Sequence, residues 1–206
     1  MIELLVATTN PGKFAEVQAF LENLPLRILS LENISNPPSV IEDGKTFEEN
    51  ALKKARALAD FTGLLALADD SGLEVDALDG APGIYSARYA GAGGDDERNN
   101  TKLLDTLENV PRERRTARFV CALALCAPRS HGKQDWTVRE SCEGEIAFTR
   151  AGRNGFGYDP LFFYPPLGKT FGEIDQQTKA TVSHRGKALQ RLAEALPMLL
   201  DARIQT

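Results

Sequence analysis

Three scarcities limit what this 206-residue chain can be. It has three cysteines, an odd number with no C-x-x-C pair, which excludes a disulfide framework and a zinc ribbon. It has no apolar run of about 18 residues, and its first residues lack the basic and small-residue flanks of a signal peptide. Positive charge is also scarce, since 24 Lys and Arg stand against 29 Asp and Glu. We therefore predict a protein of a reducing cytoplasm that binds no nucleic acid and no membrane.

The chain does have enough apolar material for a large core, because 42% of its residues are hydrophobic. The hydrophobic pattern changes period repeatedly, which favours a mixed α/β fold. Strands are predicted over residues 2–7, 26–30, 64–68, 73–77, 116–126 and 136–148, and helices after Pro11, after Thr46, over 95–108 and at the C-terminus. No linker or repeat divides the sequence. We predict one domain over residues 1–206, in which any two lobes are interwoven rather than sequential.

The first candidate site is the turn between the strand 2–7 and the helix that follows it. Asn10 is the expected N-cap, and Pro11 occupies the first helical position. Backbone amides and the positive end of a helix form an anion site, to which Lys13 adds a full charge. An ordinary Asn-Pro helix start with a solvated lysine explains the same residues.

Two pairs of adjacent acids form the next candidate site. Asp69 and Asp70 follow the buried strand 64–68, where carboxylates can hold a hard cation or accept a proton from water. An Asp-Ser-Gly turn capped by its own side chains is the competing interpretation. Glu42 and Asp43 precede the helix that opens with the capping box Thr46–Glu49. They either complete a metal site with Asp70 or lie on a surface loop.

Two clusters in the last third of the chain also carry chemistry. The segment 155–160 (GFGYDP) places aromatic faces beside the Asp159 carboxylate, a composition that suits recognition of a planar ring. A tight turn whose aromatics pack in the core is an equally good interpretation. Lys179 and the run 183–186 (SHRG) make an anion or carbonyl-oxygen site in composition. A helix cap with exposed charges is the simpler interpretation of that cluster alone.

The order of these motifs along the chain is more specific than any one of them. It comprises T-x-N-x-x-K, T-F-x-E-N-A, A-D-D-S-G-L-x-V-D-A-L-x-G-x-P-G-x-x-S-A-R, F-G-Y-D-P and S-H-R-G, from residue 7 to residue 187. This combination resembles the inosine triphosphate pyrophosphatase family. The resemblance implies an elongated mixed β-sheet flanked by helices, with two interwoven lobes and the active site in the cleft between them. It also implies Mg²⁺-dependent hydrolysis of ITP, dITP and XTP to the nucleoside monophosphate and pyrophosphate by a homodimer.

The resemblance assigns roles to individual residues. It implies that Asp70 is the catalytic base and a metal-linked carboxylate, that Ser71 lies beside it on the substrate, and that Glu42 is a further Mg²⁺ ligand. The implied triphosphate-binding turn consists of Thr8, Thr9, Asn10, Pro11, Gly12 and Lys13. The implied base and phosphate contacts of the second lobe are Phe156, Gly157, Tyr158, Asp159, Lys179, His184 and Arg185. Thr9 departs from many relatives, which have glycine or serine there. Whether Asp43 or Asp69 also binds the metal stays open.

Elementary chemistry agrees with such an activity. Phosphoanhydride hydrolysis needs neutralised phosphoryl oxygens and an oriented water, so we expect attack on the α-phosphorus with Asp70 accepting the proton. Donors such as Arg185 and His184 facing O6 of the base favour a 6-oxo purine over adenine. How guanine is rejected, and which of ITP, dITP and XTP is preferred, cannot be read. A Maf-like pyrophosphatase for modified nucleotides and a non-catalytic nucleotide-binding module are the alternatives.

Overall fold

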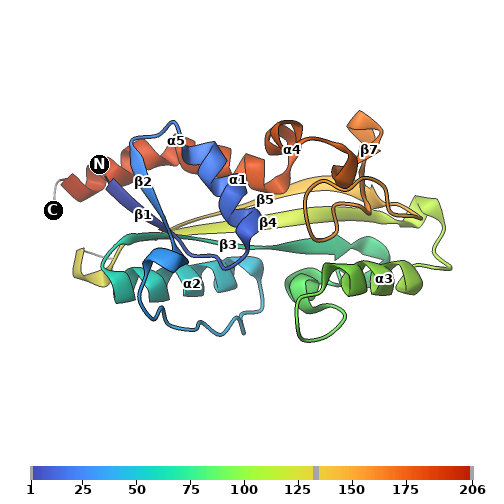
Figure 1. Cartoon of the computed structure of the whole chain (residues 1–206), viewed down its shortest axis with the longest axis horizontal. Coiled ribbons are helices and arrows are strands. Elements are labelled where there is room, and N and C mark those ends of the chain that lie inside the picture. The colour runs from blue at the N-terminus through green and yellow to red at the C-terminus, as the bar shows by residue number, and fades with distance from the viewer. Residues whose placement is uncertain (1, 132–134, 205–206) are drawn as a thin grey trace. The chain divides into compact units, whose positions relative to one another are not determined.

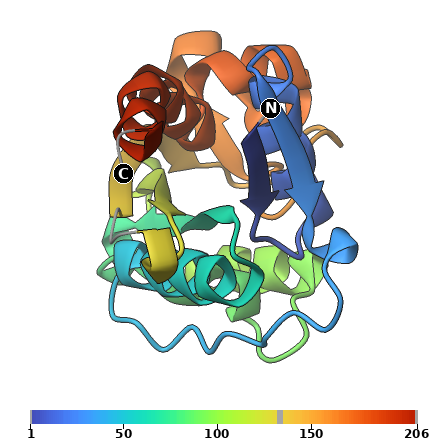
Figure 2. The same ribbon diagram turned by 90° about the vertical axis from the view of Figure 1, so that its left-hand side faces the viewer.

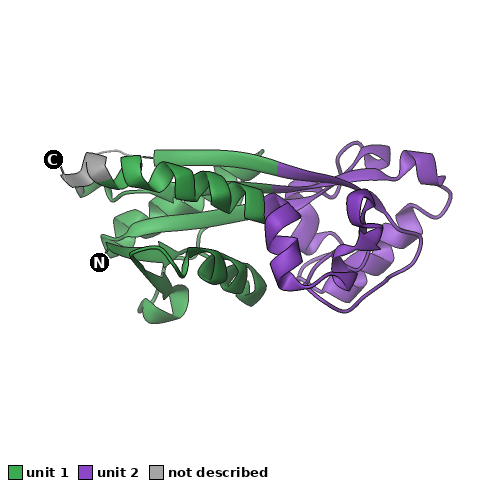
Figure 3. Cartoon of the chain, turned by 90° about the horizontal axis from the view of Figure 1, so that it is seen from above, with its two compact units in different colours: residues 1–70, 121–140, 186–206 green, residues 71–120, 141–185 purple. Residues whose placement is uncertain are grey.

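A computed structural model describes residues 2–131 and 135–204. By its internal contacts the chain divides into two compact units, each built from separate segments of the sequence (Figure 3). Unit 1 comprises residues 1–70, 121–140 and 186–206, and unit 2 comprises residues 71–120 and 141–185. That the active site lies in a cleft between two lobes stays a prediction.

All strands of the described chain belong to one mixed sheet, in the order β2-β1-β3-β4-β5-β6-β7 (Figure 1). They are β1 (Ile2–Val6), β2 (Leu26–Ser30), β3 (Leu65–Val75), β4 (Thr116–Cys126), β5 (Asp135–Ile146), β6 (Phe162–Tyr164) and β7 (Lys169–Thr170). β1 pairs in parallel with β2 and with β3, whereas β6 pairs antiparallel with β5 and with β7. Helices connect and flank the strands, which confirms the predicted α/β class.

The helices are α1 (Pro11–Leu21), α2 (Phe47–Thr62), α3 (Asp96–Thr106), α4 (Gln176–Val182) and α5 (His184–Ile204). Their caps follow the sequence closely. Asn10 caps α1 by accepting from the Lys13 amide, and Thr46 caps α2 by accepting from the Glu49 amide. α2 ends at Gly63, which adopts a left-handed conformation with φ of 72°. These three predicted boundaries are confirmed.

The sheet of unit 1 has helices on both faces, α1 and α5 on one and α2 on the other (Figure 2). Alternate residues of β3 and β4 explain the difference between the faces. The face toward α1 and α5 carries large side chains, which form one core cluster with both helices: Leu65, Leu67, Leu123, Leu125, Val17, Leu21, Leu189, Leu192 and Leu196. The other alternate positions are small and buried, as are their counterparts on α2: Ala66, Ala68, Ala122, Ala124, Ala51, Ala55 and Ala59. Small side chains on both surfaces allow a helix to approach a sheet closely.

The core of unit 2 is built around aromatic rings. Phe162 lies against Phe119 and Phe171, with ring centroids 4.5 and 4.9 Å apart. Leu73 and Val75 from β3 and two leucines from α3 complete this cluster. Tilted aromatic pairs of this kind contribute about 0.5–1.5 kcal/mol beyond the area that they bury.

One predicted boundary is wrong, and it matters for the site. The sequence suggested two strands, 64–68 and 73–77, separated by an Asp-Asp-Ser-Gly turn, but β3 is a single strand of 11 residues from Leu65 to Val75. Aspartate and serine favour turns because their side chains bond their own backbone. Here the Asp69, Asp70 and Ser71 side chains instead bond lysine and arginine side chains from helices, so the backbone stays extended.

Candidate functional site

The turn before α1 has the geometry of an anion site. Thr8 Oγ1 accepts from the Asn10 amide at 3.1 Å, and Asn10 Oδ1 accepts from the Lys13 amide at 3.0 Å. Among the described residues no hydrogen bond is assigned to the amides of Thr9 and Gly12, which lie at the positive end of the helix. Since Pro11 has no N–H, these two amides are the backbone donors that the turn can offer to a phosphate, beside the ammonium of Lys13.

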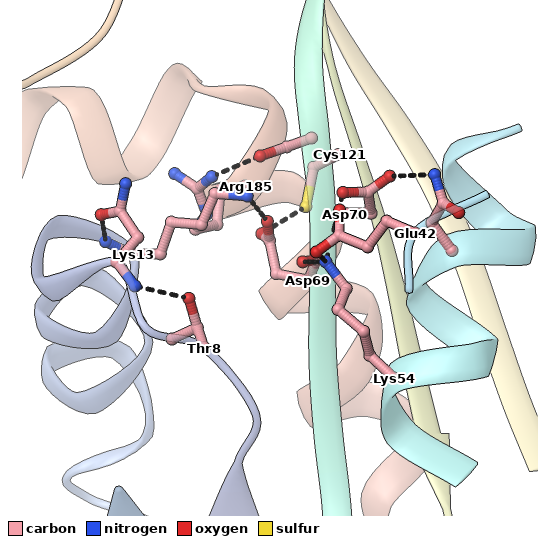
Figure 4. Close-up of polar contacts among 11 residues, drawn as sticks. Thr8, Lys13, Glu42, Lys54, Asp69, Asp70, Cys121 and Arg185 are labelled. Carbon is pink, nitrogen blue, oxygen red and sulfur yellow. Dashed lines mark hydrogen bonds and ion pairs between the residues drawn. The ribbon is translucent and has the colours of Figure 1, made fainter. Parts of the chain in front are cut away.

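Asp69 and Asp70 are adjacent in β3, so their side chains leave the strand on opposite faces of the sheet (Figure 4). Asp69 faces α1, where its Oδ1 lies 2.6 Å from Lys13 Nζ. Its Oδ2 accepts from the Cys121 thiol at 3.1 Å. Asp70 faces α2, where it accepts from Asn50 Nδ2 at 3.2 Å. The two carboxylates therefore have different partners and belong to two different clusters, and whether Asp69 also binds a metal stays a prediction.

Lys54 of α2 connects the acids that lie on the α2 face. Its Nζ donates to the backbone carbonyl of Asp69 at 2.8 Å and lies 3.2 Å from Asp70 Oδ1 and 3.3 Å from Glu42 Oε1. Asp43, the neighbour of Glu42, pairs instead with Lys53 at the exposed surface. Of these two acids, Glu42 is therefore the one that shares a cation with Asp70.

The electrostatics of this cluster suit a proton acceptor. Burial raises the pKa of the Asp70 carboxyl above its ordinary value, although the positive charges of Lys54 and Lys13 act in the opposite direction. Burial by itself lowers the pKa of Lys54, but three neighbouring carboxylates, Asp70 foremost, outweigh it and raise that pKa above the ordinary value. Lys54 is thus a permanent cation beside a carboxylate that is more basic than a solvated aspartate.

The residues on the α2 face fit a hard divalent cation. Carboxylate and carbonyl oxygens are the ligands that such ions take, and Lys54 Nζ already occupies a point that three of these oxygens surround. Within residues 2–131 and 135–204 no group of three or more His, Cys, Asp and Glu side chains gathers into a metal site. An ion held by Glu42 and Asp70 alone would keep most of its water or bind substrate oxygens.

Lys54 and Asn50 were missed by sequence reasoning. Asn50 is 1% exposed, and its Oδ1 accepts from the Gly44 amide at 2.8 Å, so it joins Asp70 to the loop that carries Glu42. The two residues are one helical turn apart, beside the apolar stripe that contains Phe47 and Ala51. Polar residues at the edge of a buried stripe were the signal that could have found them.

Unit 2 contains a second cluster, built on the turn of residues 155–160. The Asp159 carboxylate accepts from the Phe156 amide at 2.9 Å and lies 2.5 Å from Lys179 Nζ on α4. Both charged side chains are buried, at 2% and 5% exposure. A Cβ on Gly155 would lie 1.9 Å from Asp159 Oδ2, so only glycine fits at this position. The sequence thus forms the turn around a buried ion pair.

The start of α5 completes this cluster. Arg185 donates to Ser71 Oγ at 2.8 Å, and the His184 ring stacks on Phe119 with centroids 4.8 Å apart. His184 and Arg185 are 4% and 2% exposed, so the interpretation of this run as a cap with exposed charges is wrong. The Phe156 ring lies near two cations, 4.8 Å from Lys179 Nζ and 5.6 Å from Arg185 Cζ. Cations beside an aromatic face suit both a planar base and an anion.

Comparisons with known proteins place this chain in a family. The sequence model of the Ham1 family matches residues 4–195. A relative named dITP/XTP pyrophosphatase from Geobacter sulfurreducens is 55% identical over 95% of this chain and 97% of its own, and one of the same name from Desulforamulus reducens is 50% identical over 96% and 97%. The structure of a HAM1 protein from Coxiella burnetii superposes with a TM-score of 0.87 at 41% identity, covering 96% of this chain and all of that one. The chain belongs to the Ham1 family.

Proposed function

We propose that this protein hydrolyses dITP, ITP and XTP to the nucleoside monophosphate and pyrophosphate, and so removes deaminated purine nucleotides. Membership of the Ham1 family and the names of its relatives support this substrate class. The single observation that carries the chemistry is the cation position at Lys54 Nζ, within 3.3 Å of carboxylate oxygens of Asp70 and Glu42. A polyanionic substrate approaches such carboxylates only when cations neutralise the charge of the carboxylates and of the substrate.

The triphosphate binds at the turn of residues 8–13 in this proposal. The amides of Thr9 and Gly12 and the ammonium of Lys13 bind phosphoryl oxygens, and the α1 dipole adds to their effect. Lys13 and Lys54 exchange a carboxylate partner for a phosphate partner when substrate arrives. Both lysines therefore neutralise charge that grows on the phosphoryl group during hydrolysis.

We assign Asp70 as the general base. Its carboxylate accepts the proton of a water that attacks the α-phosphorus, and pyrophosphate leaves. A raised pKa makes Asp70 a better proton acceptor than a solvated aspartate, and Asn50 holds its Oδ2 in place. A bound divalent ion, which we propose to be Mg²⁺ held by Glu42 and Asp70, supplies charge neutralisation on the phosphoryl oxygens.

We assign the cluster of unit 2 to the purine base. Phe156 offers a ring face, and Arg185, His184 and Lys179 offer hydrogen-bond donors to a 6-oxo group. The 6-amino group of adenine is itself a donor, so it would leave these protein donors without an acceptor. A buried donor left unpaired costs about 1–3 kcal/mol. The pre-organised ion pair between Asp159 and Lys179 keeps these groups from adapting to the wrong base.

A panel of nucleoside triphosphates tests the function, with pyrophosphate as the assayed product and with Mg²⁺ present or removed by a chelator. The proposal predicts turnover of dITP, ITP and XTP that exceeds turnover of dATP and dGTP by at least about 100-fold, and only with the metal. Equal rates on all purines would refute the assignment. Binding of dITP without hydrolysis would instead indicate a non-catalytic nucleotide-binding module.

We also propose a homodimer that works in the cytoplasm. Among the described helices none is long and apolar enough to span a membrane. Sedimentation equilibrium of the purified chain tests the dimer, since a mass near 45 kDa is about twice that of the 22.5 kDa chain.

A further inference from the structure

The turn of residues 155–160 is fixed by three elements of unit 2. Tyr158 Oη donates to the Ser86 carbonyl at 2.8 Å, and Asp159 binds Lys179 of α4. The third element is α3, which binds Gly157. No residue of α3 takes part in the chemistry proposed above.

Both backbone groups of Gly157 bond to α3. Its N–H donates to Asp96 Oδ2 at 2.7 Å, and its carbonyl accepts from Asn100 Nδ2 at 2.8 Å. Asn100 is 1% exposed, and its Nδ2 also donates to the Asp96 carbonyl at 2.9 Å. One helix thus contacts the two peptide planes that meet at Gly157.

The turn contains two glycines, and Gly157 is the loosely packed one: a Cβ there would meet nothing within 4 Å, whereas a Cβ on Gly155 would meet the Asp159 side chain. The φ of Gly157 is +62°, a left-handed conformation that glycine reaches without strain, and a glycine backbone rotates more freely than any other. Hydrogen bonds to the peptide planes on both sides remove that freedom. The plane that bears the Gly157 N–H is also the peptide bond to Phe156, so α3 fixes the backbone on the C-terminal side of Phe156, from which its ring extends.

We propose that Asp96 and Asn100 are positioning residues that set the purine selectivity of the enzyme, because they fix Gly157 and with it Phe156. The inference rests on the proposed function, which assigns this turn to the base. Selection between a carbonyl and an amino group at one ring position depends on donor positions within a few tenths of an ångström. Loss of either contact lets the turn adapt to the wrong base.

Asn100→Ala tests the proposal, with Asn99→Ala as the matched control. Asn99 is the preceding residue of α3, is 3% exposed, and also makes two backbone contacts, with the Ala90 amide at 2.7 Å and the Ala87 carbonyl at 3.2 Å. Asn100→Ala should raise KM for dITP about 3- to 10-fold, leave kcat within about twofold, and reduce the preference for dITP over dATP by a similar factor. Asn99→Ala should lose comparable thermal stability and keep the preference of the wild type.

Asp96→Ala is the second variant, because Asp96 is exposed and its loss leaves the core intact. Asp96→Ala should also reduce the preference for dITP over dATP. The inference is overturned if the wild type prefers dITP but Asn100→Ala and Asp96→Ala prefer it equally strongly, or if Asn99→Ala loses the preference to the same extent. A wild type with no preference for dITP contradicts the proposed function instead, so the two failures can be told apart.

Discussion

Both units contain ion pairs between a lysine and a carboxylate, but the pairs differ in their exposure to solvent. In unit 1 the Lys54 side chain is 13% exposed and its partner Glu42 is 37% exposed. In unit 2 the Lys179 and Asp159 side chains are 5% and 2% exposed. Partly solvated ion pairs contribute little and exchange partners readily, whereas breaking a buried pair leaves an uncompensated charge.

This difference corresponds to the two tasks of a selective hydrolase. In the proposed function the acids and lysines of unit 1 change partners when phosphate and metal bind, and the Lys54–Glu42 pair, whose carboxylate is 37% exposed, is weak enough to allow this exchange. The pair of unit 2 shapes the turn that we assign to the base, so it is built to stay in place. Variants of the two clusters should therefore fail in different ways.

The largest effect is expected for Asp70→Asn. Loss of the general base should lower kcat for dITP by about 10²- to 10⁴-fold. The melting temperature should change little, because an amide fills the same space and Lys54 keeps Glu42 as a partner. Steady-state kinetics and thermal unfolding check both statements, and near-normal turnover would remove Asp70 from the mechanism.

Asp159→Asn should act on stability instead. The buried Lys179 ammonium then faces a neutral amide, and the free energy of unfolding should fall by about 3–5 kcal/mol. Glu3→Gln is the control, because its pair with Arg27 is exposed and should contribute less than about 1 kcal/mol. Urea unfolding measures both. Equal losses would show that the Asp159 pair is not distinguished by its burial.

Glu42 and Asp43 offer a finer comparison within unit 1. Glu42→Gln should raise the Mg²⁺ concentration for half-maximal activity about tenfold, because Glu42 shares its cation with Asp70. Asp43→Asn should leave it unchanged, because Asp43 pairs with Lys53 at the surface. A magnesium titration of the activity of each variant measures this concentration. If it rises in Asp43→Asn and not in Glu42→Gln, Asp43 is the metal ligand instead.

The smallest effect is expected at Cys121, whose thiol bonds the Asp69 carboxylate opposite Lys13. Cys121→Ala removes the donor and should lower kcat/KM for dITP about 2- to 5-fold, whereas Cys121→Ser keeps a donor and should retain most of it. If both variants behave alike, the thiol acts through packing and not through its hydrogen bond.

Local signals in the sequence predicted much of the fold. The caps at Asn10 and Thr46, the stop at Gly63 and the strands 26–30 and 116–126 depend on neighbouring residues and were predicted correctly. The continuity of β3 could not be predicted, because Asp69, Asp70 and Ser71 stay extended only through partners far away in the sequence. α4 was missed because it is seven residues long.

The candidate site was predicted by residue type but not by arrangement. The motif order named the acids and cations as candidates, since each matches a family pattern at its own position, and their roles stay a prediction. That Asp69 and Asp70 face opposite ways follows only once β3 is known to be continuous. Lys54 and Asn50 bring Glu42 and Asp70 together through tertiary contacts, which the linear sequence does not specify.

The ratio of kcat/KM for dITP to that for dATP tests the division of tasks most directly, measured side by side in Asp70→Asn and Phe156→Leu. Asp70→Asn should lose activity on both substrates and keep the ratio within about threefold of the wild type. Phe156→Leu should retain most of kcat and lose about tenfold or more of the ratio. A ratio that falls about tenfold or more in Asp70→Asn, or that stays at the wild-type value in Phe156→Leu, would contradict this division of tasks.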